Sequence, residues 1–93
     1  MMETSKRIEI YGQVQGVYFR ASLREKAIAL GLSGWVRNRR QGWVEACIQG
    51  EAEKVATLIS WSRRGPEAAR VVRVEIFDED GAHYADFRQL PTL

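Results

Sequence analysis

Hydrophobic and polar residues alternate along the first part of the chain. Between positions 7 and 14 every second residue is apolar or glycine, and those between are charged, polar or aromatic. Successive side chains of a strand point to opposite faces, so this period of two predicts a strand with one buried face. The residues predicted to face inward are Ile8, Ile10, Gly12 and Val14, and the outward ones are Arg7, Glu9, Tyr11 and Gln13.

The period becomes helical after position 22. Ser22 and Glu25 fit the S-x-x-E capping box, in which each side chain bonds a backbone N–H at the helix start. Gly31 can adopt the left-handed conformation that commonly ends a helix. A helix is therefore predicted from Ser22 to about Gly31. Its apolar positions at helical spacing are Leu23, Ala27 and Leu30.

The middle of the chain predicts a hairpin followed by a second helix. Residues 34–39 and 42–49 read as short strands, joined so closely through Arg40 and Gln41 that they should pair with each other. The helix is predicted after Gly50, with acidic residues first and basic residues last, as the helix dipole favours. The residues predicted to face inward are Val44, Ala46 and Ile48 in the strand and Val55, Leu58, Ile59 and Ser62 in the helix.

Two further strands are predicted near the end. The first carries alternating apolar residues, namely Val72, Val74 and Ile76. The pair Asp80 and Gly81 predicts a turn. Ala85 and Phe87 then mark a short last strand, which is expected to return beside the preceding one.

This order of elements predicts the α+β class. Strand, helix, strand, strand, helix and strand, with a short final strand, describe a ferredoxin-like two-layer sandwich in which two helices cover one face of a mostly antiparallel sheet. The 93 residues fit one small domain, 1–93. The same fold carries RNA binders, metal chaperones and enzymes, so it does not by itself indicate a function.

Composition indicates the cellular location of the protein more clearly than its function. Fourteen basic and twelve acidic residues give a net charge of +2, which demands neither nucleic acid nor an anionic membrane as partner. The single cysteine cannot crosslink the domain, and the N-terminal apolar run is too short for a signal peptide or a membrane span, which favours a cytoplasmic location. With one histidine and one cysteine, zinc-ligand spacings are absent, so we expect no metal and no cofactor.

The stretch from Gly12 to Ser22 has the layout of an anion-binding loop. A glycine-containing turn leaves the first predicted strand and leads into the first predicted helix, where backbone N–H groups can converge on a negative ligand. Arg20 lies at the junction, where a positive charge faces the positive end of the helix dipole and is unfavourable until an anion binds. An ordinary glycine turn with Arg20 in water fits this stretch as well, and both interpretations stay open at this point.

Two segments of the chain resemble the signatures of the acylphosphatase family. The sequence IYGQVQGVYFR at positions 10–20 matches the first signature, and GWVRN at 34–38, followed by Gly42, Val44 and Gly50, is similar to the second at the same spacing. The predicted order of elements is also that of the family, so the resemblance covers nearly the whole chain. One departure is Arg39, which stands where some relatives carry a hydroxyl residue.

The resemblance implies that the protein is an enzyme, an acylphosphatase, which hydrolyses the carboxyl–phosphate bond of acyl phosphates to carboxylate and inorganic phosphate. By the family pattern Arg20 binds the phosphate and Asn38 orients the attacking water, without a metal or a covalent intermediate. The implied partners are a small acyl phosphate and inorganic phosphate, the product and inhibitor, with no nucleic acid, no membrane and a monomeric state. The backbone amides implied to form the phosphate loop are those of Gln15, Gly16, Val17, Tyr18, Phe19 and Arg20.

The chemistry of phosphoryl transfer agrees with these roles. A guanidinium group matches two phosphate oxygens at once, and an amide side chain can both accept from and donate to a water molecule. A carboxylate leaves as a weak base, so no general acid is required. Asn38 taken alone could equally be a turn residue beside the hairpin.

An RNA-binding module is the alternative function. Tyr11, Trp35 and Trp43 share the predicted outward face of the sheet, where they could stack bases. The strand after Trp43 lacks the basic-glycine-aromatic run of the usual RNA-binding strand. An accessory protein that binds phosphate without turnover also stays open.

Three other features of the chain have interpretations that involve no catalytic role. The arginines of the hairpin could steer anionic substrates or simply form a solvated charged loop. Cys47 is expected to be inert, and His83 is expected to be exposed and without a role. The arginines concerned are Arg37, Arg39 and Arg40.

Overall fold

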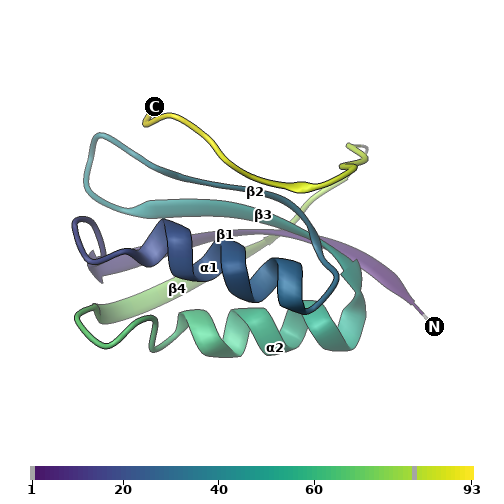
Figure 1. The fold of residues 1–93 in the computed structure, drawn as a ribbon, viewed down its shortest axis with the longest axis horizontal. Coiled ribbons are helices and arrows are strands. Elements are labelled where there is room, and N and C mark those ends of the chain that lie inside the picture. Colours follow the sequence, from purple (N-terminus) through teal and green to yellow (C-terminus); the bar gives the residue numbers. More distant parts are fainter. Residues whose placement is uncertain (1, 81) are drawn as a thin grey trace.

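The structure is a computed structural model that describes residues 2–80 and 82–93. Two helices cover one face of a five-stranded sheet, and the other face is open (Figure 1). This confirms the predicted α+β, ferredoxin-like arrangement. The elements in chain order are β1 (Glu3–Gln13), α1 (Phe19–Ala29), β2 (Ser33–Asn38), β3 (Val44–Glu51), α2 (Ala52–Ser62), β4 (Arg70–Asp78) and β5 (Phe87–Gln89).

The strands lie in the order β4-β1-β3-β2-β5. β1 pairs antiparallel with both β3 and β4, and β2 pairs antiparallel with β3 as the predicted hairpin. Because β1 and β2 both run antiparallel to the β3 strand between them, their C-terminal ends point toward the same end of the sheet. The loop that follows β1 and the last residue of β2 are thereby brought to one place, although α1 separates them along the chain.

The predicted inward residues of β1, β3 and α2 form the core. Ile8 and Ile10 are fully buried, as are the inward residues of β3, and they pack against the buried sides of both helices. In α2 the predicted residues are the ones that are buried. Neither helix in the described part of the chain has the length and apolar content of a membrane-spanning segment. The buried residues of α2 are Val55, Leu58, Ile59 and Ser62.

Gly12 is an exception to the inward pattern, since it is exposed near the end of β1. It lies opposite an irregularity in β4, where Tyr11 pairs with Arg73 but Gly12 pairs with Val71, so Val72 is an extra residue. At Gly12 φ is 135°, and a Cβ atom would come within 2.0 Å of the Arg70 carbonyl oxygen. Glycine therefore permits the close approach of the two backbones.

The start of the first helix differs from the prediction. α1 begins at Phe19, and Ser22 lies inside it, with its backbone N–H donating to the Tyr18 carbonyl at 3.0 Å. The predicted capping box is therefore not formed, because the chain enters α1 directly from the loop and no side chain caps the helix. The predicted end is confirmed, since Gly31 has a φ of 73° directly after the last turn. The earlier start moves Arg20 into the first turn.

The last strand also differs from the prediction. β5 does not return beside β4 but pairs in parallel with β2, at the opposite edge of the sheet. Ala85 lies outside the strand, which contains only three residues. Gly81 of the predicted turn lies outside the described residues. The edge beside β2 accepts β5 because Gly34 and Val36 there offer open backbone groups, with the Leu90 N–H donating to the Val36 carbonyl at 2.8 Å.

Candidate active site

A cavity of about 520 Å³ opens between the loop after β1, the first turn of α1 and the end of β2. Arg20 and Asn38 both line this cavity. The sequence predicts both as site residues, although they lie in separate segments. The parallel directions of β1 and β2 explain the juxtaposition. The lining residues are Val14, Gly16, Tyr18, Phe19, Arg20, Ala21, Asn38 and Gln89.

The loop after β1 turns through two residues with positive φ. Gly16 has a φ of 75°, and Tyr18, at the position before α1, has a φ of 62°. A side-chain-bearing residue in the left-handed region costs about 1 to 2 kcal/mol, and the exposed Tyr18 ring gains little packing in return. Within the described chain, the backbone N–H groups of residues 15–20 donate to no protein acceptor. The loop thus holds strained backbone around free donors, a combination that is typical of functional sites.

Arg20 is half-buried in the first turn of α1. Among the described residues it has no ion-pair partner, and the first turn of α1 contains no acidic residue. The first turn of α2, by contrast, contains Glu53. The positive end of the α1 dipole and the Arg20 guanidinium therefore both act on the cavity without a protein anion to balance them.

Asn38 is the last residue of β2 and is only 8% exposed. Its Oδ1 atom is buried and accepts no hydrogen bond from a described residue. An unpaired buried acceptor is costly in a folded protein and is rarely left without a reason. Its backbone is held firmly, because the Asn38 carbonyl accepts a hydrogen bond from the Leu93 N–H at 3.1 Å. The Asn38 backbone is thus held at the cavity wall, and no described residue bonds its side-chain oxygen.

The family model described as acylphosphatase matches residues 6–89. The chain belongs to the acylphosphatase family. Its class is therefore that of acylphosphatases, which are hydrolases with acyl phosphates as substrates.

Individual acylphosphatases are similar to this chain over most of its length. One from Albidiferax ferrireducens is 51% identical over 81 residues, covering 87% of this chain and 88% of that protein. One from Pyrobaculum islandicum is 44% identical over 95 residues and covers both chains fully. The structure of an acylphosphatase from Coxiella burnetii superposes with a TM-score of 0.91 at 40% identity, covering 95% of this chain and 93% of that one.

Two predicted loop residues of this acylphosphatase do not line the cavity. The Gln15 side chain turns toward the β2–β3 hairpin, and Val17 packs against the core. Gln89, in contrast, lines the cavity from β5 and was not foreseen. The sequence does not indicate this position, because its pattern predicts β5 beside β4 at the other edge of the sheet.

Cys47 and His83 lie away from the cavity of the acylphosphatase. Cys47 is buried on the open face of the sheet, and burial raises the pKa of its thiol, which makes the reactive thiolate scarcer. His83 is exposed, as expected from the sequence. Neither residue is among those that line the cavity.

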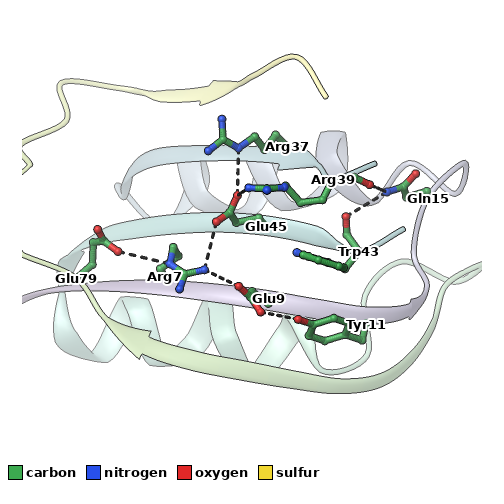
Figure 2. Close-up of polar contacts among 9 residues, drawn as sticks. All are labelled: Arg7, Glu9, Tyr11, Gln15, Arg37, Arg39, Trp43, Glu45 and Glu79. Atoms are coloured by element: carbon green, nitrogen blue, oxygen red, sulfur yellow. Dashed lines mark hydrogen bonds and ion pairs between the residues drawn. The ribbon is translucent and has the colours of Figure 1, made fainter. Parts of the chain in front are cut away.

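A network of charged side chains crosses the open face of the sheet (Figure 2). Glu45, which is 6% exposed, accepts hydrogen bonds from Arg7 at 3.2 Å, Arg37 at 3.1 Å and Arg39 at 3.0 Å. The Arg7 guanidinium also donates to Glu9 at 2.7 Å. Arg37 and Arg39 are therefore engaged in ion pairs, whereas Arg40 is exposed.

The network extends along β1 to Tyr11. The Tyr11 hydroxyl donates to Glu9, and this bond lowers the pKa of Glu9 while raising the pKa of Tyr11. The hydrogen bond to Glu9 likewise raises the pKa of Arg7. Glu9 and Arg7 therefore stay charged, and Tyr11 stays neutral, over a wide pH range around neutrality.

Replacing Glu45 with glutamine is expected to destabilise the fold. The substitution leaves three guanidinium groups close together around a neutral side chain, and removing one partner of a buried ion pair costs up to 3 to 5 kcal/mol. Because the arginines are partly exposed, we expect about 2 kcal/mol, measured by urea denaturation. Glu75→Gln is the matched control, since its pair with Arg73 is exposed and its loss should hardly move the midpoint. Equal midpoints for both variants would contradict the stabilising role of Glu45.

The aromatic residues of the open face do not form a free stacking platform. Tyr11 and Trp43 lie with ring centroids 5.3 Å apart, and Arg73 covers the Tyr11 ring at 4.0 Å. Arg37 lies 4.5 Å over the Trp35 ring, whose Nε1 donates to the Tyr84 hydroxyl. The faces that an RNA-binding module would offer to bases are therefore in contact with arginines of the acylphosphatase itself.

Proposed function

We propose that the chain hydrolyses acyl phosphates in this cavity without a metal or a covalent intermediate. Arg20 and the backbone amides of residues 15–20 bind the phosphoryl oxygens, and Asn38 orients the attacking water. The water oxygen forms a bond to phosphorus as the bond from phosphorus to the acyl oxygen breaks. The products are a carboxylate and inorganic phosphate, and the proton of the water passes to the phosphate or the solvent.

The unpaired Oδ1 of Asn38 carries this proposal. A buried acceptor at the wall of a cavity that also contains Arg20 is suited to accept a hydrogen bond from a water molecule beside a bound anion. The free amides of residues 15–20 and the uncapped start of α1 support the same assignment, since they favour negative charge. Arg20 and the loop amides thus match the phosphoryl group, and Asn38 matches the attacking water.

The proposed mechanism relies on position and charge. In phosphoryl transfer, negative charge is spread over three equatorial oxygens, and fixed donors stabilise it best. The Arg20 guanidinium can bind two of these oxygens, and the loop amides can bind the rest. Holding the water in line with the leaving carboxylate then lowers the entropic part of the barrier.

The proposal is tested by phosphate release from benzoyl phosphate with the purified protein in the presence of a metal chelator. We expect full turnover with chelator present and competitive inhibition by inorganic phosphate. Activity that disappears with chelator and returns with a divalent cation would contradict a metal-independent mechanism. Phosphate binding without turnover would favour an accessory protein.

The monomeric state and the cytoplasmic location expected from the sequence are part of the same proposal. One copy of the chain brings Arg20, Asn38 and the loop of residues 15–20 to the cavity, so the proposed chemistry does not require a second copy. Sedimentation analysis tests the monomeric state, and cell fractionation tests the location.

A further inference from the structure

The side chain of Gln15 joins the loop after β1 to the β2–β3 hairpin. Its Nε2 atom donates to the Arg39 carbonyl at 2.7 Å and to the Trp43 carbonyl at 3.1 Å. Figure 2 shows Gln15 reaching from the loop to this end of the hairpin. Both hydrogens of the amide are used, and the two acceptors lie on the two arms of the hairpin.

The hairpin end that Gln15 contacts is the one that carries Asn38. Asn38 directly precedes Arg39 in the chain and pairs with Val44, which follows Trp43. The Arg39 N–H also donates to the Trp43 carbonyl at 2.8 Å, so the two arms form one rigid unit. Any shift of this unit relative to the loop would move Asn38 relative to the loop amides.

The loop has few other restraints on this side. The backbone N–H groups of residues 15–20 have no described protein acceptor, and the Tyr18 side chain is 83% exposed. Gln15 is not among the residues that line the cavity, and its side-chain amide is turned to the hairpin. Its two hydrogen bonds are therefore suited to fix geometry rather than to bind.

We infer that Gln15 is a positioning residue, which sets the distance between the phosphate loop and Asn38. This inference rests on the proposed roles of that loop and of Asn38. Without the Gln15 bonds, the phosphoryl group still binds, but the water held by Asn38 is no longer in line with it. A displacement of about 1 Å in such an arrangement can lower a rate by up to about 100-fold.

The test compares Gln15→Met with Gln15→Glu. Methionine keeps the length of the side chain without donors, and glutamate places a carboxylate against two carbonyl oxygens. We expect kcat for benzoyl phosphate to fall about tenfold in the methionine variant and further in the glutamate variant. KM and the inhibition constant of inorganic phosphate should change less than about threefold in the methionine variant, because the loop amides and Arg20 stay in place.

Gln41→Glu is the matched control. Gln41 is exposed at the tip of the same hairpin and makes no side-chain hydrogen bond with a described residue. The Gln41→Glu substitution adds the same negative charge near the site without removing a bond to the loop, so kcat should stay close to that of the unmodified protein. The unfolding midpoint should be similar in all three variants, because the Gln15 bonds are exposed.

A double-mutant cycle decides whether Gln15 acts through Asn38. If it does, Gln15→Met lowers kcat tenfold in the original background and hardly at all in an Asn38→Ala background. Equal losses in both backgrounds, or a loss in KM alone, would overturn the inference while leaving the proposed function intact. An Asn38→Ala variant with full activity would instead overturn the proposed function itself.

Discussion

Replacing Arg20 with glutamine is expected to lower kcat/KM for benzoyl phosphate by at least about 100-fold. The guanidinium is the one charged side chain among the residues that line the described cavity. Glutamine retains a hydrogen-bond donor but loses the positive charge and the forked geometry that match two phosphoryl oxygens. The loss should therefore appear in the binding of both the ground state and the transition state.

The measurement that isolates this role is competitive inhibition by inorganic phosphate. Phosphate should inhibit the Arg20→Gln variant much more weakly than the unmodified protein, while far-ultraviolet circular dichroism stays the same. Lys54→Gln is a suitable control, because Lys54 is exposed in the first turn of α2, does not line the cavity, and its substitution also removes one positive charge. Unchanged phosphate inhibition in the Arg20 variant would exclude Arg20 as the phosphate-binding group.

Asn38→Ala is expected to lower kcat by at least about 100-fold without lowering stability. The Oδ1 atom is buried without a described partner, so its removal takes away no protein hydrogen bond that supports the fold and relieves an unpaired acceptor. A purely structural asparagine would behave in the opposite way, with stability reduced and activity per folded molecule preserved.

Two readouts separate these outcomes for Asn38. Urea denaturation gives the free energy of unfolding, which should be unchanged or higher in the alanine variant. Inhibition by phosphate should also be unchanged, because Arg20 and the loop amides are intact. Asn38→Asp provides a shape-matched comparison, since its negative charge at the same wall should weaken phosphate inhibition. A destabilised alanine variant with normal kcat would show that Asn38 serves the fold.

The arrangement as a whole explains how a small chain can assemble such a site. β1 and β2 run in the same direction with β3 between them, so their ends supply the loop and the amide from two distant segments. The core beneath is formed by the alternating residues of these same strands. Catalytic groups at the ends of central, well-packed strands are held more precisely than groups on long free loops.

Much of the fold follows from local sequence patterns. The buried residues of β1 and α2 follow the predicted periods, with Gly12 as the exception, because the spacing of apolar residues within one element marks the face that can be buried. In β3 the predicted inward residues are buried, but so is the opposite face from Val44 to Gln49. The candidate site was also visible in sequence, since Arg20 and Asn38 lie in segments that resemble family signatures and both line the cavity. The charge of the guanidinium and the hydrogen-bonding capacity of the amide belong to the residue types and can be read from the sequence.

Other features depend on contacts between distant segments. The three residues of β5 carry too little pattern to select an edge, and the open backbone beside β2 decided it. α1 starts at Phe19 and not at Ser22, because the loop enters the helix directly with Tyr18 in a left-handed conformation that no local preference of tyrosine predicts. The bonds of Gln15 to the hairpin and of Glu45 to three arginines join positions far apart in the chain. Local residue patterns were enough to predict the helices, most strand faces and the candidate chemistry, because these depend on neighbouring residues. Which strands pair and which side chains meet depends on hydrogen bonds between distant segments, and these form only in the assembled fold.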